Sequence, residues 1–129
     1  MILDADGAIR SLREVVYSKG PDYVYKRVES HGLGGACVNF HNGEPSCIVG
    51  HVFAMLGLTQ EAAELVGVAG TSIASVSCLY LNRSDFEWEF TDQAVCLLAL
   101  AQDYQDSACS WGQALEACEG LYARMLAEK

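Results

Sequence analysis

Apolar side chains recur at spacings of three and four residues through most of this chain, and this helical periodicity constrains the fold more than any other feature. Residues that cap or break helices divide the pattern into short segments. Asp6 is the expected N-cap of the first helix, and Gly20 ends it. Thr91 is the expected cap of a long helix, and Ser110-x-x-Gln113 is a capping box for the last. The expected helices cover residues 7–18, 46–56, 60–66, 72–82, 91–106 and a segment after 110.

Three short segments are rich in β-forming residues instead: 23–28, 36–40 and 86–90. Asn42-Gly43 is a hairpin signal. Pro45 lacks the amide that a return strand needs, so we expect Pro45-Ser46 to start a helix rather than a strand. The predicted fold class is α+β and predominantly helical, with about five helices packed in one domain over residues 1–129 and a minor two- or three-stranded antiparallel sheet.

The composition supports a globular domain and no membrane span. The chain has 129 residues, of which 51% are apolar and 19% charged, unlike a disordered sequence. No apolar run approaches the roughly 18 residues that a membrane-spanning helix needs. The N-terminus lacks a basic region followed by an apolar core, so no signal peptide is predicted. These features predict a cytoplasmic protein.

The net charge of −9 is unevenly distributed along the chain. Residues 1–27 are nearly balanced, whereas the segment between Arg83 and Arg124 holds eight acidic side chains and no basic one. Such a surface repels phosphate, so we expect no direct nucleic-acid binding. The acidity fits a basic partner or simple solubility, and it leaves open a mimic of DNA charge that inhibits a nucleic-acid enzyme.

Six cysteines are widely spaced and include no C-x-x-C pair. Without an export signal a disulfide framework is not expected. Reduced cysteine behaves as a small apolar residue and is often buried. We therefore expect most of the cysteines to be core thiols. Those in apolar helical patterns are Cys78, Cys96, Cys109 and Cys118.

One set of residues has the ligand types of a structural zinc site: Cys37, His41, Cys47 and His51. Its spacing argues against zinc, because residues 37 to 41 are expected to be extended and would then separate Cys37 from His41 by roughly 13 Å. The alternative places Cys47 in the core, Cys37 in the sheet, His41 in a turn and His51 on a helix surface. A small zinc protein or an enzyme built on this set remains an alternative.

Three aromatic side chains, Phe86, Trp88 and Phe90, alternate with acidic residues and would share one face of a short strand. If the core covers this face, the pattern is ordinary packing. If the face is exposed, it is a candidate patch for binding a partner. The neighbouring carboxylates could act as general acids or bases, but exposed alternate positions explain them without catalysis; they are Asp85, Glu87, Glu89 and Asp92.

Two longer motifs resemble those of an uncharacterised family of small proteins from actinobacteria and their phages, of the mycobacteriophage type. The first is Gly43-x-Pro45-Ser46-Cys47-Ile48-Val49-Gly50-His51, preceded by Cys37-x-x-Phe40 and followed by Leu56-Gly57. The second is Ala101-Gln102-x-x-Gln105-Asp106-x4-Ser110-Trp111-x-x-Ala114-Leu115. The resemblance covers most of residues 23–118. It implies structural roles for Cys47 and Gly50 and a phage or prophage setting, and it carries over no functional residues.

These observations favour a non-enzymatic accessory protein that acts by binding another protein, or a second copy of itself, in the host cytoplasm. No coherent catalytic set is recognised, and no cofactor is predicted. The two alternatives are the acidic DNA mimic and the zinc protein or enzyme described above.

Overall fold

The computed structural model describes residues 2–25, 40–41, 44–45, 47–57 and 89–128. Within them the predominantly helical class is confirmed: four helices are described, where about five are expected from the sequence. The expected helices over 60–66 and 72–82 lie outside the described residues. The elements, in order, are β1 (Ile2–Leu3), α1 (Ala5–Lys19), β2 (Phe40–His41), β3 (Glu44–Pro45), α2 (Ile48–Met55), β4 (Glu89–Phe90), α5 (Asp92–Asp106) and α6 (Trp111–Ala127).

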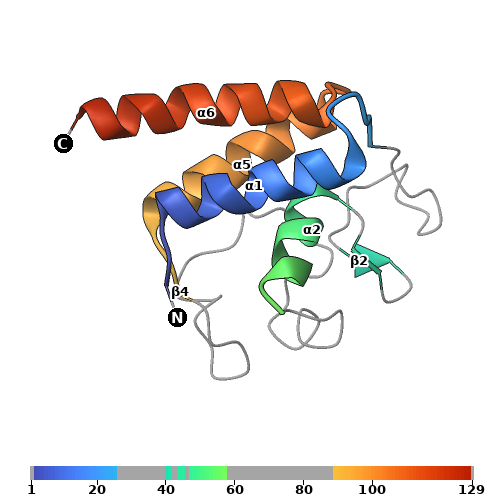
Figure 1. Cartoon of the computed structure of the whole chain (residues 1–129), viewed down its shortest axis with the longest axis horizontal. Coiled ribbons are helices and arrows are strands. Elements are labelled where there is room, and N and C mark those ends of the chain that lie inside the picture. The colour runs from blue at the N-terminus through green and yellow to red at the C-terminus, as the bar shows by residue number, and fades with distance from the viewer. Residues whose placement is uncertain (1, 26–39, 42–43, 46, 58–88, 129) are drawn as a thin grey trace.

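Helices α1, α5 and α6 lie side by side, and each contacts the other two (Figure 1). α5 and α6 run antiparallel, whereas α1 and α5 start at the same end of the molecule. The short helix α2 lies across this layer and contacts both α1 and α5. None of the described helices is both long and apolar enough to cross a membrane.

The first pair of strands is parallel, which differs from the antiparallel sheet expected from 23–28, 36–40 and 86–90. Residues 26–28, 36–39 and 86–88 of that expected sheet lie outside the described residues. β1 pairs with β4, and Leu3 lies opposite Phe90. Residues 23–25 form no strand. The Trp111 amide donates to the Tyr23 carbonyl at 2.8 Å. This segment therefore provides a hydrogen-bond acceptor for the first amide of α6 instead of pairing with a strand.

The second pair, β2 and β3, is an antiparallel hairpin, so the expectation that Pro45 prevents a return strand is also wrong. His41 pairs with Glu44, and Phe40 pairs with Pro45. In an antiparallel ladder, pairs that exchange hydrogen bonds alternate with pairs that do not, and the pair beside a two-residue connection is the bonded one. Pro45 therefore occupies a position where no amide is required.

In the C-terminal half of the chain the helices begin at the predicted caps, whereas in the N-terminal half they begin at other residues. The Thr91 hydroxyl accepts from the Ala94 amide, and the Ser110–Gln113 capping box forms with both hydrogen bonds present. The first helix starts two residues early, because the Asp4 carboxylate, rather than that of Asp6, accepts from the Gly7 amide. α2 begins at Ile48, with Cys47 as its N-cap.

The core of the described residues is formed where α1, α2, α5 and α6 meet. α2 is mostly buried, as its mainly apolar sequence predicts, and only its side that bears His51, Ala54 and Met55 is partly open. Phe53 stacks on Phe90 with ring centroids 6.0 Å apart. The fully enclosed large side chains include Trp111, Phe53, Phe90, Ile9, Leu12, Ile48, Leu97 and Leu98.

The cysteines divide between core and surface. Cys47 and Cys118 are buried, as expected, and the Cys118 thiol donates to the Leu97 carbonyl. Cys96 is exposed and Cys109 is half-buried in the turn before α6, so the prediction of core positions is wrong for Cys96. Its position on α5 lies opposite the stripe of buried residues, so the side chain faces away from the core. Cys37 and Cys78 lie outside the described residues.

Candidate partner-binding groove

α1 presents three faces to three different surroundings. Its buried side chains follow helical spacing and point into the core. These are Ala5, Ala8, Ile9, Leu12, Val15 and Val16. A second face contacts α6, and a third lines a groove toward α2. Tyr17, which is 69% exposed, lies on the remaining solvent-facing side of the helix.

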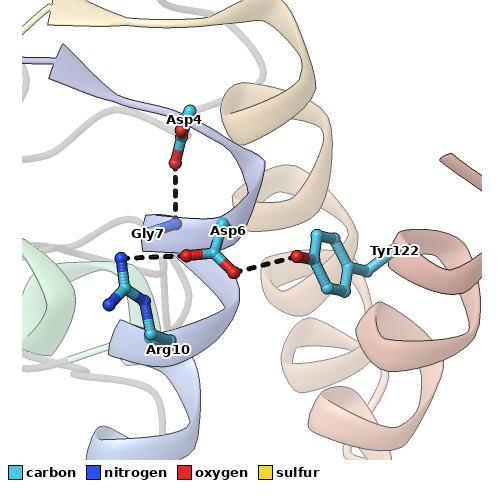
Figure 2. Close-up of polar contacts among 5 residues, drawn as sticks. All are labelled: Asp4, Asp6, Gly7, Arg10 and Tyr122. Atoms are coloured by element: carbon cyan, nitrogen blue, oxygen red, sulfur yellow. Dashed lines mark hydrogen bonds and ion pairs between the residues drawn. The ribbon is translucent and has the colours of Figure 1, made fainter. Parts of the chain in front are cut away.

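The second face of α1 is joined to α6 by polar contacts (Figure 2). The Asp6 carboxylate lies between two partners: Arg10 reaches it at 2.9 Å, and the Tyr122 hydroxyl donates to it at 2.9 Å. This hydrogen bond raises the pKa of Tyr122. About two turns beyond Asp6, the Arg13 Nε donates to the Glu119 carboxylate at 3.0 Å. These groups therefore satisfy one another between α1 and α6.

The third face of α1 forms one wall of an open groove. Asp4, Gly7, Ser11, Glu14 and Ser18 recur at spacings of three and four residues, so they lie along one side of the helix. Two hollows follow this side, of about 380 Å³ and about 460 Å³. The first is lined by Ile2, Leu3, Asp4, Gly7, Arg10, Ser11, Glu14, Met55 and Leu56, and the second by Glu14, Val15, Ser18, His51, Ala54 and Met55.

Glu14 and Met55 line both hollows, so we treat the two as one groove between α1 and α2, the α1–α2 groove. Two large apolar side chains of its lining are exposed: Ile2 at 65% and Met55 at 45%. Isolated exposed apolar residues are common on any protein, but two in one concave lining are a feature of binding surfaces. The groove therefore combines exposed apolar area with a few polar groups.

The groove has few charged side chains, and they differ in whether they have a partner. Arg10 is paired with Asp6, and Asp4 accepts from the Gly7 amide. Glu14 is exposed and takes part in neither of the two ion pairs found within the described residues. Glu14 is thus an uncompensated carboxylate at the middle of the α1–α2 groove.

His51 lies in the groove wall and is held in one tautomer by its own helix. Its Nδ1 lies 2.9 Å from the Cys47 carbonyl, which can only accept, so Nδ1 carries the proton and Nε2 is the acceptor. Desolvation lowers the pKa of His51 from its ordinary 6.5. The ring is therefore neutral near pH 7. Within the described part of the chain, no hydrogen bond joins His51 to Glu14 or Ser18, so these groups do not form a nucleophile–base relay.

Beneath the groove, the N-terminus of α2 is satisfied from two directions. The Cys47 thiol accepts from the Gly50 amide at 3.4 Å. The Gln105 side chain, which is only 2% exposed, reaches from α5 and accepts from the Ile48 amide at 2.7 Å. The cysteine-containing motif and the Gln105-Asp106 motif, far apart in the sequence, thus meet at one helix end.

An aromatic cluster connects the same region to α6. The Trp111 ring is edge-on to His51, with centroids 5.2 Å apart, and to Tyr23, with centroids 4.6 Å apart. Lys19 lies over the outer ring of this cluster, 5.1 Å from the Tyr23 centroid. The Trp111 Nε1 is buried and has no conventional hydrogen-bond acceptor among the described residues. The cluster thus joins His51 of the groove wall to the start of α6, through ring contacts and the hydrogen bond from the Trp111 amide to the Tyr23 carbonyl.

The four candidate zinc ligands are not assembled in the described structure. Cys37 lies outside the described residues, and His41 is described only as part of the β2 backbone. Cys47 is buried at the start of α2, and His51 is directed to the Cys47 carbonyl. Within the described residues no group of three or more metal-binding side chains occurs.

The aromatic candidates are only partly described. Phe90 is 1% exposed and packs on Phe53, so it is not available at the surface. Phe86 and Trp88 lie outside the described residues. Their role as partner-binding anchors stays a prediction.

The acidic residues proposed for a DNA mimic are only partly described, because Asp85 and Glu87 lie outside the described residues. Asp92 and Asp103 share a side of α5 but are separated by about 16 Å along its axis. Glu119 is paired with Arg13. Duplex DNA carries a charge about every 3.4 Å on each strand. The DNA-mimic alternative stays a prediction.

Sequence reasoning missed Glu14, Ser18, Ile2 and Met55 as groove residues. The signal for α1 was present, because its polar residues fall on two separate sides of one helix, and only one of them can face α6. The contributions of Ile2 and Met55 could not be read in this way. They depend on how β1 and α2 are placed against α1.

Comparisons of the chain with protein-family models, with curated proteins and with solved structures find no match in any of the three. The functional argument therefore rests on the geometry of this chain.

Proposed function

We propose that this protein is a non-enzymatic accessory protein that acts by binding another protein. The phage or prophage setting and the host cytoplasm belong to the same proposal, and they are supported by the sequence motifs described above. The α1–α2 groove is the surface that we assign to binding.

One observation carries the proposal: Ile2 and Met55, both exposed, line a single groove between β1, α1 and α2. Removing apolar surface from water contributes roughly 25 cal/mol per Å². Flexible methionine side chains adapt to a partner's shape. A groove of this kind provides the apolar anchor of an interface, with Asp4 and Glu14 as parts of its polar rim.

The chemistry of the lining favours binding over catalysis. The groove holds a carboxylate, a hydroxyl and an imidazole in Glu14, Ser18 and His51, but no hydrogen bond links them within the described residues. The buried thiol of Cys47 is directed to the α2 backbone and does not line the described groove. Among the described residues, Glu14, Ser18 and His51 therefore lack the mutual contacts of a nucleophilic site, and the Cys47 thiol lacks access.

The test is retention of a partner from an actinobacterial host lysate by the tagged full chain. Met55→Glu places a charge in the groove, whereas Leu126→Glu makes the same kind of change at an exposed apolar position of α6. We expect a protein retained by the wild type and by Leu126→Glu, and lost by Met55→Glu. Circular dichroism of both variants checks that the helices are intact.

Light scattering of the purified chain distinguishes a separate partner from a second copy of this chain. A monomer that retains no protein would contradict the proposal, and so would retention that does not change in Met55→Glu.

A further inference from the structure

The shape of the α1–α2 groove selects the kind of segment that it can hold. Along α1 the lining runs from Gly7 to Ser18, a distance of about 16 Å or three helical turns. The opposite wall is α2, whose Ala54 and Met55 face the same space. Two helices thus form a trough in which a third elongated segment can lie.

A helix fits this trough better than a strand. A bound strand needs an open sheet edge to satisfy its backbone, and β1 supplies only two residues at one end of the groove. The rest of the described lining is helix side chains. A helix satisfies its own backbone hydrogen bonds and requires only complementary side chains, placed at i, i+3, i+4 and i+7.

The charge of the groove selects the polar side chains of that helix. The free carboxylate of Glu14 lies where the two hollows join, close to the apolar Met55. The cation in the lining, Arg10, is already paired with Asp6. The chain as a whole carries a net charge of −9, which attracts a basic partner and repels a second copy.

We propose that the α1–α2 groove binds an amphipathic helix of a partner protein, with apolar side chains against Met55 and a lysine or arginine paired with Glu14. This inference rests on the proposed function and adds the chemical class of the partner. The apolar face supplies most of the affinity, and the Glu14 pair sets orientation and selects basic helices over acidic ones.

The test uses two synthetic peptides as probes, each roughly 14 residues or four turns long. Both carry leucine at i, i+3, i+4 and i+7, and the remaining positions are lysine in one peptide and glutamate in the other. Binding to the full-length protein is measured by fluorescence anisotropy at physiological salt. We expect the lysine peptide to bind about ten-fold or more tightly than the glutamate peptide.

Two variants with matched charge separate a local pair from general attraction. Glu14→Gln and Glu116→Gln each remove one exposed carboxylate, the first in the groove and the second on α6. We expect Glu14→Gln to weaken the lysine peptide about three- to five-fold and Glu116→Gln less than about 1.5-fold. Met55→Ala should weaken the same peptide about five- to ten-fold, because it removes the apolar anchor.

Equal losses in Glu14→Gln and Glu116→Gln would overturn the inference, since binding would then follow net charge alone. Equal binding of both peptides, or binding of neither, would overturn it as well. The proposed function is tested separately: a natural partner that depends on Met55 but not on Glu14 would leave that function standing and refute only the basic helix.

Discussion

The buried Gln105 offers a direct test of how α2 is held beneath the groove. Its side-chain oxygen accepts from the Ile48 amide at 2.7 Å, and both residues are almost fully enclosed. Gln105→Met keeps a side chain of similar size and flexibility but removes the acceptor. The first amide of α2 then loses this acceptor in a place that water does not easily reach.

The magnitude follows from the cost of a buried donor that loses its partner, about 1–3 kcal/mol. For a domain of this size a loss of about 2 kcal/mol lowers Tm by roughly 6–10 °C. Part of the loss comes from the hydrogen bond that the Gln105 Nε2 donates to Asp106 at 3.1 Å. The free energy of unfolding is measured by urea titration followed by circular dichroism.

The matched control is Gln93→Met, the same change at an exposed position of the same helix. It should alter stability by less than about 0.5 kcal/mol. Hydrogen exchange adds a local measurement, because the Ile48 amide should exchange faster in Gln105→Met. Equal stability of the two variants, with unchanged protection of Ile48, would refute the proposed anchoring of α2 by α5.

Three further predictions test the packing and the titration of particular side chains. Gly112→Ala should destabilise the protein by about 2 kcal/mol in thermal unfolding, because a Cβ at this position would lie 2.7 Å from the Pro21 carbonyl oxygen. The control Gly120→Ala, whose Cβ would meet nothing within 4 Å, should be neutral or stabilising by up to about 1 kcal/mol. Equal effects of the two substitutions would contradict the close approach of Gly112 to Pro21. Burial lowers the pKa of His51, so as pH falls below about 6.5 the imidazole is protonated in the unfolded chain before it is protonated in the folded one, and the free energy of unfolding should decrease toward the lower folded pKa. Urea midpoints at about pH 7.5 and 5.5 should therefore differ less in His51→Gln than in the wild type. Identical pH profiles of the two proteins would contradict this prediction. Burial raises the pKa of the Cys118 thiol to about 12, so iodoacetamide should modify exposed Cys96 well before Cys118 in the native protein, and peptide mapping by mass spectrometry should show the difference vanish in urea.

Local signals explain which parts of the fold could be predicted. Thr91 and the Ser110–Gln113 capping box bond to amides three residues away, so the sequence around each helix end contains the whole interaction. The burial of α2 likewise follows from its mainly apolar composition. Such features need no knowledge of the distant chain.

Long-range pairing explains what could not be predicted. Leu3 and Phe90 are 87 positions apart, and two-residue strands contain too little pattern to identify their partners. The residues around Tyr23 are of types that favour strands, but the Tyr23 carbonyl accepts a hydrogen bond from the Trp111 amide at the start of α6. The groove was missed for the same reason, because Met55 and Glu14 become neighbours only when α2 packs on α1.

Photo-crosslinking in cells of the proposed actinobacterial host tests the central claim most directly. A photoreactive phenylalanine derivative is placed at Met55 in the groove or, as a control, at Tyr104, an exposed position of α5 that lines neither hollow of the groove. If the α1–α2 groove binds a partner, irradiation should give a discrete heavier adduct from position 55 and none from position 104. No adduct from position 55, or the same adduct from both positions, would contradict the assignment of this groove to partner binding.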